Sequence, residues 1–222
     1  MMVRGIIVTL IYLAFLVAIL FTSAGRVDWT MGWMTLGIYI VISILAIIFA
    51  DRELLSERCQ IKPGVKLREV LLASISFVFL FPFTLLISGL DVGRFEWSPS
   101  YHSALHVVAL IVFTIGNVFA LWAVISNNYF STFVRIQKDR NHKVVTEGPY
   151  KYVRHPGYAG AIVAAITLPI SLGSLWALIP TAIGVFGFGF RTAYEDRILL
   201  EELRGYDEYS QRVRFRLIPG VW

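Results

Sequence analysis

The sequence of 222 residues contains one cysteine, Cys59. A single thiol cannot form a framework of disulfides within the chain, and it cannot supply the several thiolates of a structural zinc or iron–sulfur site. His102 and His106 lie four residues apart, but the closest carboxylate in the sequence is Glu96, and two imidazoles provide too few ligands for a metal ion. We therefore expect no metal site.

Charged residues are also scarce, at 16% of the chain against 57% hydrophobic residues, a composition outside the range of water-soluble globular proteins. Because an α-helix rises about 1.5 Å per residue, about 20 apolar residues cross the roughly 30 Å hydrocarbon core of a bilayer. Five uncharged runs reach that length: 5–25, 29–50, 70–90, 97–134 and 155–190. The first run is longer than the apolar core of a signal peptide, so we expect it to be retained. The sequence thus predicts an all-α, polytopic integral membrane protein.

The fifth run holds two prolines, Pro169 and Pro180, on either side of Ser171, Gly173 and Ser174. Prolines and small residues interrupt helices, so this run predicts a helical hairpin that turns near residue 172. We expect five to six transmembrane helices, six if the hairpin crosses the membrane completely. A hairpin that re-enters the membrane from one side fits the sequence equally well.

The net charge of +5 is compatible with nucleic-acid binding until the positions of the 20 basic residues are considered. All of them except Arg26 and Arg94 fall on one side of the predicted spans. By the positive-inside rule, both termini and the long loops then face the cytoplasm. We therefore expect a multi-pass membrane protein, in the plasma or inner membrane if prokaryotic, with its active site on the cytoplasmic side and no nucleic-acid partner.

The polar residues that could bind a ligand or take part in catalysis are concentrated in these predicted cytoplasmic segments, above all in 135–158. Pro156 suits the first position of a helix, and such a helix leaves its N-terminal amides unpaired beside His155, where they can bind an anion. Arg191 and Glu195 are four residues apart and share one helix face just below the membrane. An interfacial salt bridge is the simpler explanation of this pair alone, whereas its position at a membrane boundary favours a functional site.

Two further patterns concern packing and surface binding. Gly184, Gly187 and Gly189 lie inside an apolar helix with no strand before them, so we expect close helix packing rather than a nucleotide-binding loop. Residues 205–222 alternate basic with aromatic or apolar residues, which is typical of an amphipathic tail on a membrane surface. A scaffold that binds anionic headgroups needs no more than this tail.

Four segments together resemble the isoprenylcysteine carboxyl methyltransferase family: His142 to Tyr158, the pair Glu195 and Asp196, the pair Gly205 and Tyr206, and the end from Arg216 to Trp222. Phospholipid N-methyltransferases are similar in the same region. The resemblance implies S-adenosylmethionine-dependent methyl transfer without a Rossmann domain. It also implies one integrated membrane domain, with four transmembrane helices over 1–126 and a cofactor-binding loop, helical hairpin and cytoplasmic segment over 127–222.

Carried over position by position, the resemblance implies these cofactor-binding residues: His142, Lys143, Val144, Val145, Tyr150, His155, Pro156, Gly157, Tyr158 and Glu195. Arg191 corresponds to a family arginine associated with the methyl acceptor, so Arg191 is the expected substrate-binding residue, and Arg191 and Glu195 are the expected catalytic residues. A family glutamine aligns by spacing with Arg135, while Gln137 lies two residues later, and which of them contacts the cofactor stays open. The implied partners are membrane lipids and a lipophilic or prenylated methyl acceptor.

These residue types suit methyl transfer. Glu195 and the aromatic faces of Tyr150 and Tyr158 can hold a sulfonium cation, and the free amides expected near His155 suit the methionine carboxylate. The preferred acceptor is a carboxylate, which needs no base and which Arg191 would neutralise and aim. An amine acceptor needs a base, for which His155 is the nominee. The alternatives are thus an N-methyltransferase of phospholipids or amines and a sterol-reductase-like NADPH oxidoreductase, a class that shares the Arg-His-Pro turn.

Overall fold

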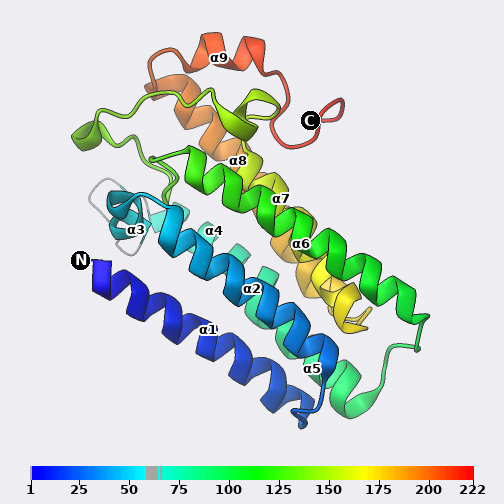
Figure 1. Ribbon diagram of the computed structural model, residues 1–222. Helices are drawn as coiled ribbons and strands as arrows, with labels where there is room; N and C mark the ends of the chain where they lie inside the picture. Colours follow the sequence, from blue (N-terminus) through cyan, green and yellow to red (C-terminus); the bar gives the residue numbers. More distant parts are fainter. Residues whose placement is uncertain (1, 59–64, 66) are drawn as a thin grey trace.

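Figure 1 shows the computed structural model, which describes residues 2–58, 65 and 67–222. Every regular element in this part of the chain is a helix, and no strand occurs in it. Four helical segments are long and apolar enough to cross a membrane. The predicted all-α, polytopic membrane fold is confirmed.

Three of the four segments are continuous helices, namely α1 (Met2–Ala24), α2 (Thr30–Phe49) and α6 (Ser103–Ser126). The remaining segment, Leu67–Phe95, changes its helical geometry along its length. It consists of α4 (Leu67–Val78), the π-helical η1 (Phe79–Phe83), α5 (Thr84–Gly89) and the π-helical η2 (Leu90–Phe95). Pro82 lies inside η1, and the wider turn accommodates a residue that has no N–H to donate.

A hairpin of two helices completes the bundle, α7 (Pro156–Leu172) and α8 (Leu178–Glu202). Helix α7 packs against α6 at a point where both carry glycine. A Cβ on Gly160 would lie 2.6 Å from the carbonyl oxygen of Gly116. The missing side chains let the two backbones approach closely, which is a common means of helix association in lipid.

Helix α8 contacts the segment Leu67–Phe95 through two of the three glycines that were predicted to pack closely. A Cβ on Gly184 would lie 2.6 Å from Cγ of Leu80, and a Cβ on Gly187 would collide with Oγ of Ser76. The packing prediction is confirmed for these two residues. Gly189 has nothing within 4 Å of its ideal Cβ position, so the prediction is wrong there, because that side of α8 is open.

The hairpin turns at Gly173, whose φ of +96° favours glycine, so the turn predicted near residue 172 is confirmed. Its tip is held at the far end of the bundle. There Ser174 donates a hydrogen bond to Oδ2 of Asp91, and Tyr101 donates to the carbonyl oxygen of Ile170, both at 2.5 Å. Asp91 lies in η2 and Tyr101 directly precedes α6, so the hairpin runs the length of the bundle.

The short helices gather at the opposite end of the bundle, together with both ends of the described chain (Figure 1). They are α3 (Arg52–Arg58), the 3-10 turns η3 (Lys138–Arg140) and η4 (Gly148–Lys151), and α9 (Tyr206–Arg212). The loop that follows α6 therefore meets α8 and α9 at one place. The cytoplasmic orientation of this end stays a prediction.

Candidate functional site

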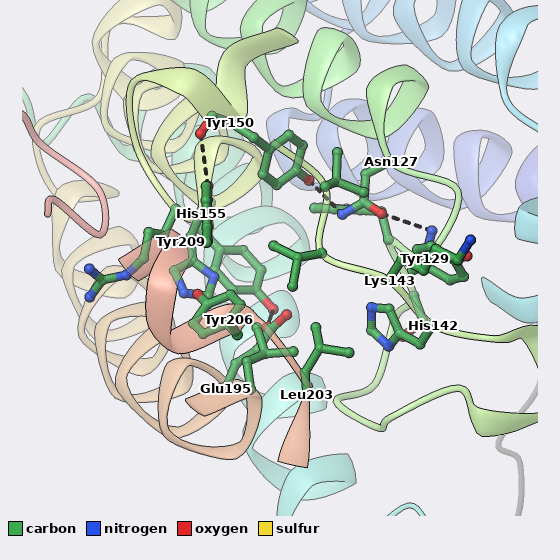
Figure 2. Close-up of a pocket in the computed structure, with 17 residues that line it drawn as sticks. Asn127, Tyr129, His142, Lys143, Tyr150, His155, Glu195, Leu203, Tyr206 and Tyr209 are labelled. Atoms are coloured by element: carbon green, nitrogen blue, oxygen red, sulfur yellow. Dashed lines mark hydrogen bonds between the residues drawn. The ribbon is translucent and has the colours of Figure 1, made fainter. Parts of the chain in front are cut away.

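A cavity lies between the 127–155 loop, the last turns of α8 and helix α9, and Figure 2 shows the side chains around it. The space between its lining atoms, together with the mouth that opens to solvent, is about 610 Å³. The lining residues are Asn127, Tyr129, Phe130, Ser131, His142, Lys143, Val144, Val145, Tyr150, Arg154, His155, Tyr158, Glu195, Leu199, Leu203, Tyr206 and Tyr209.

Most of the residues that the resemblance implies for the cofactor line this cavity: His142, Lys143, Val144, Val145, Tyr150, His155, Tyr158 and Glu195. Pro156 and Gly157 lie behind its wall, in the first turn of α7. A Cβ on Gly157 would lie 2.5 Å from the ring of Phe130, a lining residue. Gly157 therefore shapes the cavity by letting the Phe130 ring approach the helix. Arg191 lies outside the lining as well.

Several lining residues were not predicted from the sequence: Asn127, Tyr129, Phe130, Ser131, Arg154, Leu199, Leu203, Tyr206 and Tyr209. Asn127 donates to the hydroxyl of Tyr150 at 3.0 Å. The ring of Tyr129 stacks on His142, with centroids 4.4 Å apart. The adjacent aromatic pair Tyr129 and Phe130, in a polar stretch after a predicted span, was the available signal.

Helix α9 closes one side of the cavity. Tyr206 and Tyr209 lie three residues apart, so they share one helix face, and both are buried. The Tyr209 hydroxyl donates to the carbonyl oxygen of Tyr150 at 2.8 Å. The predicted membrane-surface position is therefore wrong for this part of the tail, because its aromatic face packs on the loop. Ile218 and Val221, nearer its end, are exposed.

Glu195 is the acidic group of the cavity, and Tyr158 fixes its carboxylate. The Tyr158 hydroxyl donates a hydrogen bond to Oε2 of Glu195 at 2.5 Å. The Tyr158 ring is itself held between Phe188 and His155, with centroid distances of 5.2 and 5.8 Å. A fixed carboxylate among aromatic rings is an environment that favours a cation.

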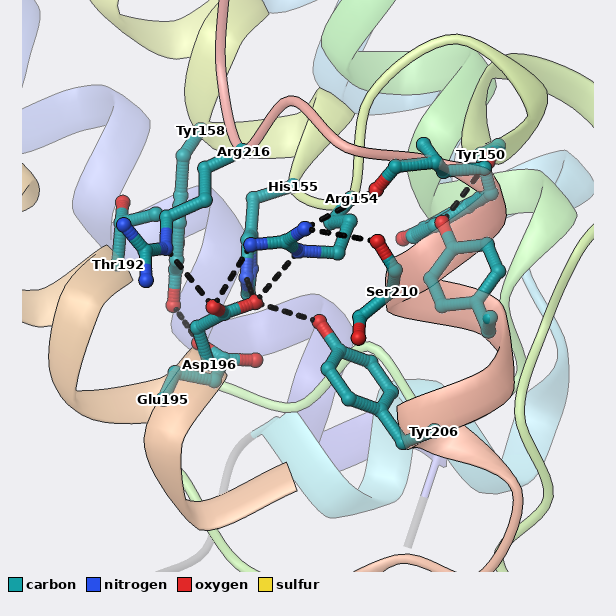
Figure 3. A network of polar contacts seen from close by, with 12 residues as sticks. Tyr150, Arg154, His155, Tyr158, Thr192, Glu195, Asp196, Tyr206, Ser210 and Arg216 are labelled. Carbon is teal, nitrogen blue, oxygen red and sulfur yellow. Dashed lines mark hydrogen bonds and ion pairs between the residues drawn. The ribbon is translucent and has the colours of Figure 1, made fainter. Parts of the chain in front are cut away.

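The buried carboxylate of Asp196 joins the loop, α8, α9 and the tail (Figure 3). It accepts hydrogen bonds from Nε and Nη2 of Arg154 at 2.8 and 2.9 Å, and from Tyr206 and Arg216 at 2.8 Å, while Nε2 of His155 lies 3.2 Å away. Burial alone would raise the pKa of Asp196, but the hydrogen bonds outweigh burial and hold that pKa well below its ordinary value. The ionised carboxylate therefore fastens the tail over the cavity.

The two backbone amides just before α7 are paired with the tail. The N–H of Arg154 donates to the carbonyl oxygen of Phe215, and the N–H of His155 donates to that of Arg216, both at 2.9 Å. Within the first turn of α7, the prediction of free amides is wrong for Tyr158 and Ala159, because both N–H groups donate to the carbonyl oxygen of His155 at 3.1 Å. The His155 side chain is also committed, since its Nε2 faces Asp196.

The imidazole of His142 forms an uncharged wall of the cavity. Burial, followed by the positive charges of Arg140 and Arg135, lowers the pKa of His142 to about 4. The ring is therefore neutral at physiological pH. Stacked on Tyr129, it offers a flat surface to a ligand.

Arg135 and Gln137, the two alternatives for the family glutamine, lie outside the lining of this cavity in the described chain. Arg135 pairs with Asp139 at 2.9 Å. The buried Gln137 donates from Nε2 to the carbonyl oxygen of Tyr129 at 2.8 Å and accepts at Oε1 from Nη1 of Arg140 at 2.7 Å. Both side chains brace the loop instead.

Arg191 lies behind Tyr158, and its side chain is only 3% exposed. Its Nε lies 3.2 Å from Oε1 of Glu69 in the first turn of α4, and its Nη2 donates to the carbonyl oxygen of Thr132. Its guanidinium carbon lies 5.4 Å from the centre of the Tyr158 ring. Tyr158 thus links Arg191 to Glu195, and no pattern in the sequence pointed to Glu69.

Residues 107–201 match the family model described as the isoprenylcysteine carboxyl methyltransferase (ICMT) family. Over these residues, which are less than half of the chain, the protein is similar to the ICMT family. The matched residues cover most of α6, the loop, α7 and nearly all of α8, and so they include Arg191 and Glu195. Helix α9 and Glu69 lie outside them. The family predicted from the motifs is confirmed.

Two plant proteins are similar to this chain over part of its length. One is the probable protein-S-isoprenylcysteine O-methyltransferase of Oryza sativa subsp. indica, 31% identical over 120 residues, which are 53% of this chain and 60% of the relative. The other is protein-S-isoprenylcysteine O-methyltransferase B of Arabidopsis thaliana, 28% identical over 151 residues, which are 65% of this chain and 77% of the relative. The chain thus spans about three fifths of the length of the rice relative.

A solved structure of a eukaryotic intramembrane Ras methyltransferase, ICMT, has the same fold. The TM-score is 0.54 at 20% sequence identity, and the alignment covers 95% of this chain and 74% of that chain. The likeness therefore extends beyond the matched family region to the first helices of the bundle.

Proposed function

We propose that this ICMT-family protein is an S-adenosylmethionine-dependent membrane methyltransferase whose active site faces the cytoplasm. The methyl acceptor is a lipophilic or lipid-linked molecule, and the methylated group is a carboxylate, as the names of the plant relatives suggest. The observation that carries the proposal is the fixed carboxylate of Glu195 inside an aromatic cavity.

The lining residues suit the chemical groups of S-adenosylmethionine, because they combine one carboxylate with several aromatic and apolar side chains. When bound, the cofactor supplies a methyl group on a sulfonium, which Glu195 and the rings of Tyr150 and Tyr158 would hold. The neutral His142 stacked on Tyr129 would hold the adenine ring, beside the apolar lining residues Val144 and Val145.

A cation is needed for the methionine carboxylate, because the His155 amide donates to the tail instead. We assign this part to Lys143, an exposed lining residue that makes no ion pair with the residues that the structure describes. An ammonium group binds a carboxylate by charge-assisted hydrogen bonds. Pro156 and Gly157 contribute indirectly, by placing the Phe130 wall.

Methyl transfer is a direct displacement, so the protein accelerates it by alignment and by exclusion of water. Tyr158 holds the Glu195 carboxylate in one position. Helix α9 covers the cavity, and Asp196 holds α9 in place through the hydroxyl of Tyr206. These residues keep the site aligned and closed.

A carboxylate acceptor needs no base, whereas an amine acceptor must lose a proton. Nε2 of the buried His155 lies 3.2 Å from Asp196, so an amine acceptor would have to use the other ring nitrogen, Nδ1, as its base. We assign the acceptor carboxylate to Arg191, whose neighbour Phe190 is 70% exposed on α8, where an apolar acceptor can approach from the lipid.

The decisive experiment supplies radiolabelled S-adenosylmethionine to membranes that contain the protein. The label should enter a lipophilic fraction and should be released by base, as a methyl ester is. Glu195→Ala should abolish incorporation, and Glu201→Ala, an exposed acidic residue further along α8, should not. Base-stable label in phospholipid would favour the N-methyltransferase alternative.

Two other results would reject methyl transfer. Stabilisation of the protein by NADPH but not by S-adenosylmethionine would favour the reductase. Liposome binding that is equal in wild type and Glu195→Ala, with no affinity for either cofactor, would favour a headgroup-binding scaffold.

A further inference from the structure

Glu69 is a buried acidic residue at the edge of the site, and the mechanism described so far does not use it. Its side chain is 1% exposed. Oε1 accepts a hydrogen bond from the N–H of Val134 at 3.3 Å and lies 3.2 Å from Nε of Arg191. A carboxylate of the protein therefore occupies the guanidinium that we assign to the acceptor.

The pair of Glu69 and Arg191 is incompletely satisfied. Oε2 of Glu69 and Nε of Arg191 are buried, and neither atom makes a hydrogen bond within the part of the chain that the structure describes. A buried ion pair is favourable only when hydrogen bonds satisfy its remaining polar atoms. This pairing is therefore a poor fit that a better-placed partner can replace.

Arg191 has two other contacts that do not depend on Glu69. Its Nη2 donates to the carbonyl oxygen of Thr132, and its guanidinium carbon lies 5.4 Å from the centre of the Tyr158 ring. Both contacts would keep the guanidinium in place after Glu69 withdrew. An incoming carboxylate can thus replace Glu69 without displacing Arg191.

The charges around Arg191 also favour replacement of Glu69 by the carboxylate of the acceptor. Two carboxylates act on Arg191, Glu69 directly and Glu195 across Tyr158, so with both ionised this cluster carries one excess negative charge. A bound sulfonium would bring the sum to zero. A carboxylate acceptor that arrived while Glu69 stayed on Arg191 would add an unmatched charge to a desolvated site, which is strongly unfavourable.

We propose that Glu69 competes with the acceptor carboxylate for Arg191 and so sets the affinity of the enzyme for its acceptor. This inference rests on the proposed function, in which Arg191 receives the acceptor. Glu69 is then a specificity-determining residue that weakens carboxylate binding until Arg191 exchanges partners.

The test compares the full-length wild type with Glu69→Gln in detergent. Glu201→Gln is the matched control, because Glu201 also pairs with an arginine on α8 but at its exposed surface. The probes are N-acetyl-S-farnesylcysteine and its uncharged carboxamide, and their binding is measured by calorimetry with S-adenosylhomocysteine present. Glu69→Gln should bind the carboxylate about tenfold more tightly than wild type and the carboxamide equally well, because one competing charge is removed.

Carboxylate binding that is unchanged or weaker in Glu69→Gln would overturn the inference, as would equal gains for both probes. Glu69→Asp provides a second variant, because it keeps the charge but withdraws it from Arg191 by one methylene. It should show a smaller gain in the same direction, and a loss would count against competition even if Glu69→Gln failed to fold.

Failure of the proposed function is seen separately, in the binding of S-adenosylhomocysteine to wild type. If that binding is absent but Glu69→Gln still binds the carboxylate more tightly than wild type, competition at Arg191 stands and the methyltransferase proposal fails. If S-adenosylhomocysteine binds and the carboxylate affinities are equal, only the competition fails.

Discussion

The hydroxyl of Tyr158 donates a hydrogen bond to Glu195 over 2.5 Å, so the first turn of α7 positions a carboxylate that α8 carries. The ring of the same tyrosine lies 5.4 Å from the guanidinium carbon of Arg191. One side chain thus links the acidic wall of the cavity to the buried cation behind it. Substitutions on the two sides of Tyr158 should therefore separate donor binding from acceptor binding.

Glu195→Gln should weaken the binding of S-adenosylmethionine more than that of S-adenosylhomocysteine. The donor carries a sulfonium charge and its product does not, so only the donor loses an ionic partner. We expect a loss of about tenfold for the donor and of less than about twofold for the product, both measured by calorimetry. Glu208→Gln, exposed on α9, serves as the control. Equal losses for the two ligands would show that Glu195 does not face the sulfonium.

Asp196→Asn should loosen the tail and destabilise the fold. The substitution leaves the buried Arg154 without its counter-charge, and breaking such a pair costs about 3–5 kcal/mol of unfolding free energy. Thermal unfolding in detergent measures the loss, and limited trypsin digestion should cut the tail after Arg212 or Arg214 faster than in wild type. Asp207→Asn, on the exposed side of α9, should change neither. A tail that remained protected would contradict the role of Asp196.

The lowered pKa of Asp196 predicts that the stability of the protein depends on pH. The folded-state pKa of Asp196 lies well below its unfolded value of about 3.9, so its stabilising contribution is complete above that pH. The contribution is lost as the pH falls below about 4 towards the folded-state pKa. Melting temperatures between about pH 6 and about pH 3 should therefore fall more steeply for wild type than for Asp196→Asn. Parallel curves would contradict this prediction.

His142 should also make the stability depend on pH, in a higher pH range than Asp196 does. Its pKa is about 4 in the folded protein and about 6.5 in the unfolded chain, so the unfolded chain binds a proton first as the pH falls. The folded state should lose stability between about pH 6.5 and about pH 4, and His142→Gln should flatten the melting curve in that interval. Between about pH 7 and about pH 8 the difference between the two proteins should stay constant, which is the internal control. A constant difference at every pH would argue against a buried, neutral His142.

Gly160→Ala should separate α7 from α6. The added Cβ would lie 2.6 Å from backbone atoms of α6, which cannot move aside as a side chain can. Overpacking of this kind costs about 1–3 kcal/mol, measured by thermal unfolding in detergent. Gly189→Ala is the matched control, because nothing lies within 4 Å of its Cβ position. It should be neutral or stabilise the helix by up to about 1 kcal/mol.

The membrane architecture was predictable because it depends on local properties. The lengths of the uncharged runs define the helices, and Pro169, Gly173 and Pro180 define the hairpin. The cavity loop was predictable for a similar reason, since His142 to Val145 and Tyr150 belong to one contiguous motif. The π-helical turns around Pro82 were not predicted, because a proline only signals a disturbance and its neighbours decide which form the disturbance takes.

The sequence did not predict that α9 covers the cavity. Alternating basic and aromatic residues suit a membrane surface and a packed lid equally well, so the pattern could not place Tyr206 and Tyr209. Likewise, Pro156 indicated the start of a helix, but nothing in the sequence showed that the tail returns to pair with the N–H of His155. Such pairings join segments that are distant in the chain, and no local sequence pattern indicates them.

The sequence by itself thus determined an all-helical membrane bundle with a methyltransferase-like loop, because hydrophobic run length and contiguous motifs are properties of single segments. Only the tertiary structure decided that Asp196 fastens the tail and that Arg191 faces Glu69 behind the cavity wall. The physical reason is that a buried charge requires partners, and those partners meet only when helices far apart in the chain pack together.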